Sequence, residues 1–468
     1  MPTTRNRVEP PQQAILKTPE QGQLTTKALN KVYSGPALIL ALPHELLAEI
    51  LELAVIPNNI HELSWRHQES TYDPAVTLPV AYTCRRFSQV VVPFNYRSIN
   101  FGYPQGIVPT NLRLRLLART FQSNPSLGLH CREFKMHIPD ITGNRLSSQE
   151  DFEFVEQILP FLPNVKSLYV HGGFGTEKNQ QTWKLLRACV QHMRRLEMME
   201  LHREGEGLKV ADVIREVQIP SLKGLCVGGF ARSNSVSCLV DLNFKAASLT
   251  SLELSDYSDS PEALEKLLSW PVRLSKFTLA PFYHNVHYID LPMIRQMLLQ
   301  HRESLTDLDI GYLSPDGTGK FSHWSEFPNL ENLTLSRWLF EASRENPNLR
   351  EFQDELADYI LAPGLKRFTL AFAIWDQHSE QWNDFGQEDE AWVRRLAQVA
   401  LERKAALQEI RIQFDPEWWG PDACQTEYPW DRMDALNKKF QTRGIIITYT
   451  KPPVTREEWS TGIANGEP

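Results

Sequence analysis

The sequence predicts an α/β fold in which short strands and helices alternate along the chain as a solenoid. The first observation is an L-x-x-L-x-L unit, seen most clearly at Leu249, Leu252 and Leu254. Because successive side chains of a strand point to opposite faces, Leu252 and Leu254 share one face and Glu253 lies on the other. The unit therefore predicts a short strand with one buried and one solvated face.

The second observation is that this unit recurs along most of the chain. The ten copies lie at Cys131/Phe134/Met136, Val165/Leu168/Val170, Leu196/Met199/Leu201, Leu222/Leu225/Val227, Leu249/Leu252/Leu254, Leu274/Phe277/Leu279, Leu305/Leu308/Ile310, Leu330/Leu333/Leu335, Leu365/Phe368/Leu370 and Leu407/Ile410/Ile412. Their first residues are 25 to 42 positions apart, mostly at or a little above the length of a leucine-rich repeat. A single copy fits any amphipathic strand, so the prediction of a repeat fold depends on the series of ten copies at similar spacing.

The third observation is helical periodicity between the copies. Trp183, Leu186 and Cys189 recur at helical spacing. The run 260–262, Ser-Pro-Glu, combines a capping serine, a proline at the first helical position and an early acid, and Leu264 follows. Strands and helices that alternate at short spacing let each unit bury the apolar face of its neighbour, which is the arrangement of a solenoid.

Composition excludes several classes of function. The 468 residues are 42% hydrophobic and 23% charged, as in a soluble globular protein. With 49 basic against 57 acidic residues the net charge is -8, which argues against a protein that mainly binds the nucleic-acid backbone. The most apolar run, 36–56, is interrupted by His44, Glu45, Glu49 and Glu52, so it does not predict a membrane span. We therefore expect neither nucleic acid nor a membrane among the partners.

The sequence offers no pattern for catalysis, a metal or a cofactor. The six cysteines form no C-x-x-C pair, and residues 1–32 are polar, so reduced thiols and a cytoplasmic or nuclear location are expected. His44-Glu45 and His61-Glu62 lack the second histidine of a zinc protease helix, and Gly317–Lys320 lacks the remaining residues of a phosphate loop. We predict that the chain is not an enzyme; the alternative requires a catalytic site built in the loops.

The N-terminal elements differ from the repeats. Residues 1–36 read as a flexible tail. Pro43 then suits the first position of a helix whose apolar residues recur at i, i+1, i+4 and i+5. A second apolar segment covers 78–91, and residues 97–101 alternate as a strand.

These segments resemble an F-box of the kind common in fungal proteins. The resemblance lies in Leu42-Pro43-x-Glu45-Leu46-Leu47-x-x-Ile50-Leu51, in Cys84-Arg85-Arg86-Phe87, in Pro93-x-x-Tyr96-Arg97-Ser98-Ile99 and in the linking segment from Leu116 to Gly128. A polar segment at about 58–76 is longer than a compact F-box needs, and we interpret it as a surface insertion, because lengthening a loop costs little entropy. The expected organisation is a tail (1–36), an F-box (37–101), a leucine-rich-repeat-like domain (102–450) and a second flexible tail (451–468).

The resemblance implies a substrate receptor of an SCF-type ubiquitin ligase. The F-box would dock on the Skp adaptor and, through it, on a cullin, while the repeats would hold an unknown protein to be ubiquitinated. The residues that match the adaptor-binding stripe are Leu42, Pro43, Leu46, Leu47, Ile50 and Leu51. Two alternatives stay open: the stripe packs on the chain's own repeats, or the chain is a leucine-rich-repeat scaffold that is not linked to degradation.

The second face of the repeat strands is the expected substrate surface, because solenoids usually bind partners along such a row. The candidate residues are Tyr169, Glu200, Glu253, Asp307 and Asp309. Their acidic character favours a basic or lysine-bearing partner, while the alternative is a merely solvated sheet face. Aromatic residues near the C-terminus, among them Trp382, Phe385, Trp418 and Trp419, are either exposed anchors or a lid over the last repeats.

Overall fold

The computed structural model describes most of the chain between Leu38 and Asn465. The described residues are 38–55, 74–101, 110–138, 149–175, 179–203, 207–230, 245–246, 248–280, 289–313, 321–340, 352–373, 380–416 and 427–465. The expected N-terminal tail lies outside these residues, as does the expected insertion up to residue 73. Residues 74–76 of that insertion already belong to a helix, because Pro74 begins one.

The described residues form one sheet of twelve parallel strands, ordered along the sheet as along the chain. The strands are β1 (Ser98–Phe101), β2 (Glu133–Ile138), β3 (Ser167–Gly172), β4 (Met198–His202), β5 (Gly224–Phe230), β6 (Ser251–Tyr257), β7 (Lys276–Leu279), β8 (Asp307–Ile310), β9 (Asn332–Ser336), β10 (Arg367–Ala371), β11 (Glu409–Gln413) and β12 (Ile446–Tyr449). Parallel neighbours need a crossover connection, and helices supply most of these. The fold is therefore α/β, as predicted.

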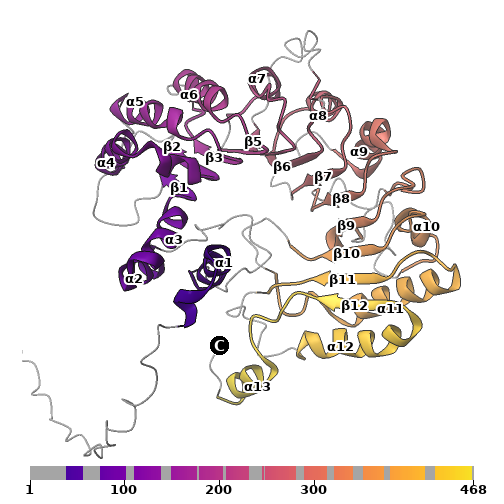
Figure 1. Cartoon of the computed structure of the whole chain (residues 1–468). Helices are drawn as coiled ribbons and strands as arrows, with labels where there is room; N and C mark the ends of the chain where they lie inside the picture. The colour runs from indigo at the N-terminus through magenta and orange to yellow at the C-terminus, as the bar shows by residue number, and fades with distance from the viewer. Residues whose placement is uncertain are drawn as a thin grey trace, which may run out of the picture.

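Helices lie before, between and after the strands in the described chain. They are α1 (His44–Val55), α2 (Pro74–Thr83), α3 (Arg85–Asn95), α4 (Thr110–Ser123), α5 (Gln149–Ile158), α6 (Asn179–His192), α7 (Val210–Glu216), α8 (Pro261–Ser269), α9 (Leu291–Leu298), α10 (Leu356–Ile360), α11 (Gln387–Glu402), α12 (Pro429–Phe440) and α13 (Arg456–Asn465), together with the short 3-10 segments η1 (Leu38–Ala41), η2 (Pro125–His130), η3 (Leu159–Phe161), η5 (Leu299–His301), η7 (Arg337–Phe340) and η9 (Gln441–Arg443). The sheet curves along an arc, with α4 to α11 on its outer side and α1 to α3 at its N-terminal end (Figure 1). One face of the sheet thus packs on helices, and the other faces the inside of the arc.

The ten predicted units all form strands, β2 to β11, and their anchors are in register. Leu252 of β6 pairs with Leu225 of β5 on one side and with Phe277 of β7 on the other. The middle anchors form one continuous row across these strands, namely Phe134, Leu168, Met199, Leu225, Leu252, Phe277, Leu308, Leu333, Phe368 and Ile410. These side chains are all buried. The row is therefore the central line of the hydrophobic core.

A backbone ladder repeats just before each strand. The Lys223 carbonyl accepts hydrogen bonds from the N–H groups of Thr250 and Ser251, and the Thr250 carbonyl accepts from Ser275 and Lys276. The same two-donor arrangement recurs from the Arg97 carbonyl to the Lys366 carbonyl. Because each ladder step satisfies backbone groups at the entrance to a strand, it holds one unit to the next at constant register.

The helix α8 begins at the predicted serine cap, and α9 begins in a similar way. Ser260 Oγ accepts a hydrogen bond from the Ala263 N–H (3.2 Å), and Pro261 occupies the first helical position of α8. Asp290 caps α9 in the same way, through the Met293 N–H (3.0 Å). Each cap satisfies an N–H that the helix itself leaves unpaired, which fixes where these outer helices begin.

Both ends of the predicted repeat domain need correction. The strand expected within the F-box segment is β1, which pairs with β2 and buries Ile99 and Phe101 in the main core, so the sheet begins at Ser98 rather than after residue 101. The expected C-terminal tail, 451–468, contains α13 instead. Its Trp459 is 4% exposed and stacks on Trp382, with ring centroids 4.5 Å apart.

The aromatic residues near the C-terminus divide into two groups. Trp382 and Phe385 are buried in the main core, so they are not exposed anchors. Trp382 also lies against Trp430 of α12, with ring centroids 5.7 Å apart. Trp418 and Trp419 lie outside the described residues. The described aromatics therefore close the C-terminal end of the core rather than present a binding surface.

Candidate protein-binding surfaces

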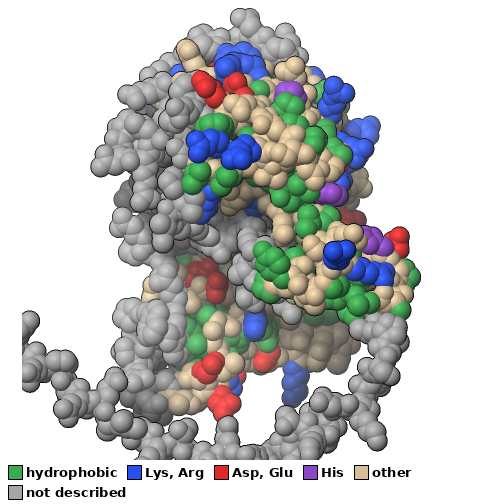
Figure 2. All heavy atoms as spheres, turned by 60° about the vertical axis from the view of Figure 1, so that its left-hand side comes forward, with side chains coloured by type: hydrophobic (Ala, Val, Ile, Leu, Met, Phe, Trp, Pro, Cys, Tyr) green, Lys and Arg blue, Asp and Glu red, His purple; other side chains and the backbone are tan. Residues whose placement is uncertain are grey.

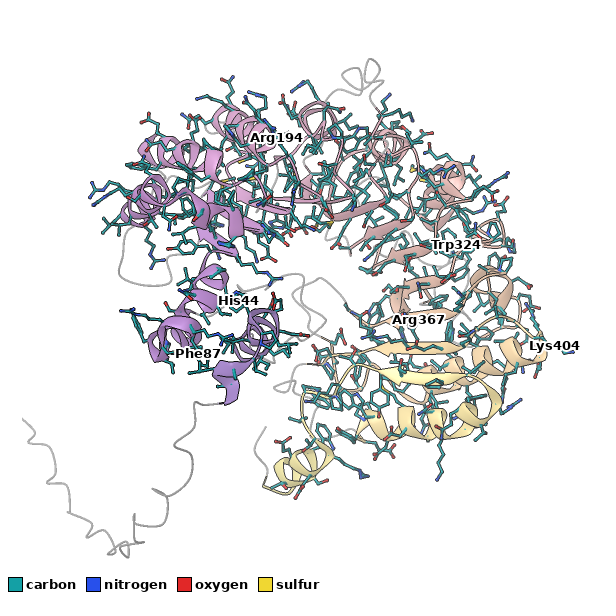
Figure 3. The ribbon with its side chains drawn as sticks, in the orientation of Figure 1. His44, Phe87, Arg194, Trp324, Arg367 and Lys404 are labelled. Carbon is teal, nitrogen blue, oxygen red and sulfur yellow. The ribbon has the colours of Figure 1, made fainter. Side chains whose placement is uncertain are left out.

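The three N-terminal helices have a hydrophobic core of their own. We call α1, α2 and α3 the helical module; in Figure 3 its α1 begins at His44 and Phe87 lies on α3. Leu47 and Leu51 of α1 pack against Val90, Val91 and Phe94 of α3. This core is separate from the core of the sheet.

The predicted adaptor-binding stripe is therefore split. Leu47 is 0% exposed and Leu51 is 4% exposed, so neither side chain can contact a partner while the module is folded. Their assignment to a docking surface is corrected: they hold α1 to α3. Leu46 is 49% exposed and Ile50 is 42% exposed on the adjacent flank of the same helix, and Pro43 is exposed at its start.

A continuous apolar row remains on the surface of α1. Leu46, Ile50 and Leu53 are spaced i, i+4 and i+7, so they lie above one another on one flank. Leu53, which is 70% exposed, was not among the predicted residues, although its spacing from Ile50 is the signal that could have identified it. The half-buried Leu42 and the exposed Ile39 lie just before the helix. In Figure 2, hydrophobic side chains lie beside basic ones on the face turned forward.

Two arginines hold the module in place. The Arg86 guanidinium of α3 donates hydrogen bonds to the carbonyl oxygens of Leu40 and Leu42, which fixes the segment before α1. Arg97, in the turn between α3 and β1, forms an ion pair with Glu52 of α1. The exposed apolar row therefore has a defined position relative to the first strand of the sheet.

The second candidate surface is the inner face of the sheet. Four of the five predicted residues belong to one row, because Tyr169, Glu200, Glu253 and Asp309 are linked in register through Cys226 and Thr278. We call this the acidic row. Asp307 lies on the same face in the neighbouring row, which also contains Arg367 of β10. Arg367 lies toward the inside of the arc in Figure 3, whereas Lys404 lies on its outer side.

The charges along this face are ordered. Lys135 of β2 is the first charged residue of the row, the acids follow on β4, β6 and β8, and Arg411 lies in the row on β11. Cys226 and Thr278, which have short side chains, occupy the strands between the acids. The middle of this row is thus negative, and its two ends carry positive residues.

Two of the predicted residues already have partners within the chain. The Glu200 Oε1 atom lies 2.7 Å from His171 Nε2, and the His171 ring lies beside that of His202, with centroids 5.3 Å apart. Asp307 accepts hydrogen bonds from Asn332 Nδ2 (2.7 Å) and Thr306 Oγ1 (2.6 Å). These contacts stabilise the sheet face and leave both carboxylates less available for a partner.

Tyr169 lies at the basic end of the acidic row. Lys135 Nζ lies 4.8 Å from the centre of its ring, a cation–π contact. Burial, together with the nearby carboxylates of Glu133 and Glu200, raises the pKa of Tyr169 to about 12. Its hydroxyl group is therefore neutral at physiological pH and can donate a hydrogen bond.

Glu253 and Asp309 have unusual electrostatics. The pKa of Asp309 is raised to about 7, first because burial penalises its charged form and second because the Glu253 carboxylate is near, while Lys276 opposes the shift. The pKa of Glu253 is also raised by burial, with Lys276 opposing and Glu200 adding to the shift. Carboxyl groups with raised pKa values are candidates for functional sites.

Asp309→Asn is expected to reduce the pH dependence of stability. An aspartate in the unfolded chain has a pKa of about 3.9, so between about pH 4 and 7 the folded chain keeps a proton that the unfolded chain releases. The free energy of unfolding therefore falls as pH rises through this interval. One pKa unit corresponds to about 1.4 kcal/mol. Because Asp309 is half-buried, we discount the full shift for solvent screening to about 2 kcal/mol.

The measurement is urea unfolding at pH 4.5 and pH 7.5. We expect Asp309→Asn to lose less stability than the parent chain between these two pH values. Glu409→Gln is a suitable control on the same face, because the pKa of Glu409 is lowered rather than raised. Equal losses of stability in the parent chain and in Asp309→Asn would contradict the raised pKa.

Metal-binding groups and membrane-spanning helices are not found in the described part of the chain. Within these residues, no group of three or more His, Cys, Asp or Glu side chains is arranged to hold a metal ion. Among the same residues, the helices are too short or too polar to cross a membrane. A pocket of about 550 Å³ lies between α6 and α7, lined by residues such as Trp183, Arg187 and Arg215, and none of its lining residues belongs to either candidate surface.

Comparisons with known proteins add little to this geometry. No protein-family model matches the chain, and no curated protein matches it. Among solved structures, the crystal structure of a Rad7 and Elc1 complex in yeast aligns with a TM-score of 0.31 and 15% identity, covering 66% of this chain and 84% of that chain. A likeness at this score carries no argument about function.

Proposed function

We propose that this chain is the substrate-recognition subunit of an SCF-type E3 ubiquitin ligase. In this proposal the helical module is an F-box that docks on the Skp adaptor and, through it, on a cullin. The strand–helix units are leucine-rich-repeat-like and form a solenoid whose inner face holds the protein to be ubiquitinated. The chain would act in the cytoplasm or nucleus, without catalytic residues or a cofactor of its own.

The observation that carries the proposal is the exposed apolar row on α1. Leu46 and Ile50 belong to the segment that resembles an F-box, and Leu53 extends their row. All three side chains are large, hydrophobic and exposed, although α1 is held firmly on its other flank by Leu47 and Leu51. Covering such side chains with a partner is favourable, by roughly 1.5 to 3 kcal/mol for each one that becomes fully buried.

The connection between the two parts supports the same proposal. A turn of two residues, Tyr96 and Arg97, joins α3 directly to β1. The Tyr96 ring packs against Phe121 of α4, with centroids 5.9 Å apart, and Arg97 is paired with Glu52 of α1. A receptor with this turn would hold its substrate face in a fixed orientation to the adaptor.

Ile50→Asp is expected to weaken binding to the Skp adaptor by at least tenfold while the chain stays folded. The substitution removes an apolar contact and places a charge where the interface would exclude water. The test is an affinity pull-down of the full chain, followed by mass spectrometry and by titration with purified adaptor. Glu49→Gln, an exposed change on the next residue of α1, should leave binding unchanged.

Leu47→Asp separates loss of docking from loss of folding. Because Leu47 is fully buried against α3, this variant should unfold the helical module, which circular dichroism and proteolysis would detect. Ile50→Asp should resist proteolysis as well as the parent chain does. If the intact chain retains no adaptor, or if Ile50→Asp retains it fully, the ligase proposal is wrong and the chain is better described as a binding scaffold.

A further inference from the structure

Glu253 and Asp309 face each other across a single strand. They lie on β6 and β8, and both are in register with Thr278 of β7. Neighbouring strands are roughly 4.8 Å apart, so the backbones at these two residues are roughly 10 Å apart. The buried anchors of β6, β7 and β8 alternate with Glu253, Thr278 and Asp309, so these three side chains lie on the opposite face of the sheet, with the shorter Thr278 between the two acids.

The two carboxyl groups differ from the other acids of the face. Glu200 and Asp307 are engaged by His171 and Asn332, respectively. In the part of the chain that the structure describes, Glu253 and Asp309 form no hydrogen bond or ion pair. Lys276 is on β7 in the neighbouring row, and its charge acts on both of them without an ion pair to either.

This arrangement costs free energy that a cation would offset. Both side chains are partly buried, and withdrawing a carboxylate from water without a partner is unfavourable. Burial raises the pKa values of both groups, Glu253 adds to the shift of Asp309, and Glu200 adds to the shift of Glu253, which is the physical sign of this cost. A positive group placed between them would relieve both effects.

We propose that Glu253 and Asp309 together bind one arginine side chain of the substrate protein, with one carboxylate on each side of the guanidinium and Thr278 beneath it. The proposal rests on the proposed function, because it gives the substrate class for the inner face. Arginine fits better than lysine, since a planar guanidinium donates along two edges and can contact two carboxylates at once. The positive ends of the acidic row, at Lys135 and Arg411, would centre the basic residue on this pair.

The test uses the intact full-length chain and three peptide libraries. Each library has five random residues on both sides of a fixed centre, which is arginine, lysine or citrulline; citrulline matches the shape of arginine without its charge. Peptides retained on the immobilised chain are counted by mass spectrometry. We expect the arginine library to be retained at least tenfold over the citrulline library and above the lysine library.

Neutral variants identify the residues responsible. Glu253→Gln and Asp309→Asn should each reduce arginine retention at least fivefold, and Thr278→Arg should abolish it, because it supplies an internal guanidinium. Glu409→Gln removes the same charge from β11 on the same face and should leave retention within twofold of the parent. Unfolding temperatures of Glu253→Gln and Asp309→Asn should equal or exceed that of the parent, because no hydrogen bond within the described chain is lost.

Equal retention of arginine and citrulline peptides would overturn the inference, as would full retention by Asp309→Asn. These outcomes are separate from failure of the ligase proposal. Ile50→Asp should lose the adaptor yet keep its preference for arginine peptides, since α1 is not part of the acidic row. A chain that binds arginine peptides but no adaptor would keep this site and lose the proposed function. A chain that binds the adaptor but shows no preference for arginine peptides would keep the proposed function and lose the arginine site.

Discussion

Leu252→Asp is expected to abolish cooperative folding of the parallel sheet. Leu252 is fully buried in β6, paired with Leu225 and Phe277 in the central row of the core. Truncating a buried leucine to alanine costs roughly 2 to 5 kcal/mol, and aspartate adds the cost of an unpaired buried charge. The free energy of unfolding of native domains is roughly 5 to 15 kcal/mol, so this single change should remove most of it. Urea unfolding followed by circular dichroism measures it.

The matched control adds the same charge to the other face of the same strand. Ser251 is the neighbour of Leu252, and its side chain points toward the inside of the arc. Ser251→Asp should change the free energy of unfolding by about 0.5 kcal/mol or less, as is usual for surface substitutions. A soluble Leu252→Asp variant with the parent's unfolding curve would mean that the anchor row is not the core.

The strands were predictable because a strand with one buried face has apolar residues at every second position, and these positions show which face is buried. The first and last strands were harder to place in the sheet. Before Ile99 and Phe101 of β1, the position of the first anchor is occupied by Tyr96, so the unit is present with an aromatic residue in place of leucine. Before Ile447 of β12, the same position is Gly444, whose φ of 98° turns the chain and whose lack of a side chain removes the anchor.

The docking stripe was only partly predictable for a geometric reason. Residues 46, 47, 50 and 51 form a wide apolar stripe, and periodicity gives its orientation on the helix but not which flank meets a neighbour. The position of α3 decides this, because Val90, Val91 and Phe94 contact only the flank with Leu47 and Leu51. The position of α3 depends on contacts between residues about 40 positions apart, which the sequence of α1 does not contain.

The same limit applies to the inner face of the sheet. Alternation along each strand correctly placed all five candidate residues on one face. It could not tell which acids have internal partners, because Glu200 meets His171 across 29 residues and Asp307 meets Asn332 across 25. Cross-strand register, rather than local pattern, separates the two acids with partners from Glu253 and Asp309.

Trp459→Ala is expected to destabilise the C-terminal end of the sheet by about 3 to 5 kcal/mol, the usual cost of removing a buried tryptophan. Trp459 stacks on Trp382 and also lies near Tyr428, whose hydroxyl donates a hydrogen bond to the Val454 carbonyl (2.9 Å). Composition suggested a polar tail here, because one tryptophan among polar residues shows no periodicity of its own. Its partner Trp382 is distant in sequence, so the contact between the two tryptophans is seen in the structure and not in the local sequence.

Urea unfolding with tryptophan fluorescence and hydrogen exchange of β11 and β12 would measure this effect. Trp459→Ala should lower the unfolding midpoint and speed exchange in these last two strands, because α13 would no longer cover the aromatic cluster. Glu457→Ala, an exposed change on the same helix, should leave both measurements unchanged. If Trp459→Ala stays within about 0.5 kcal/mol of the parent, as exposed positions do, residues 451–468 are a tail after all and α13 contributes nothing to the fold.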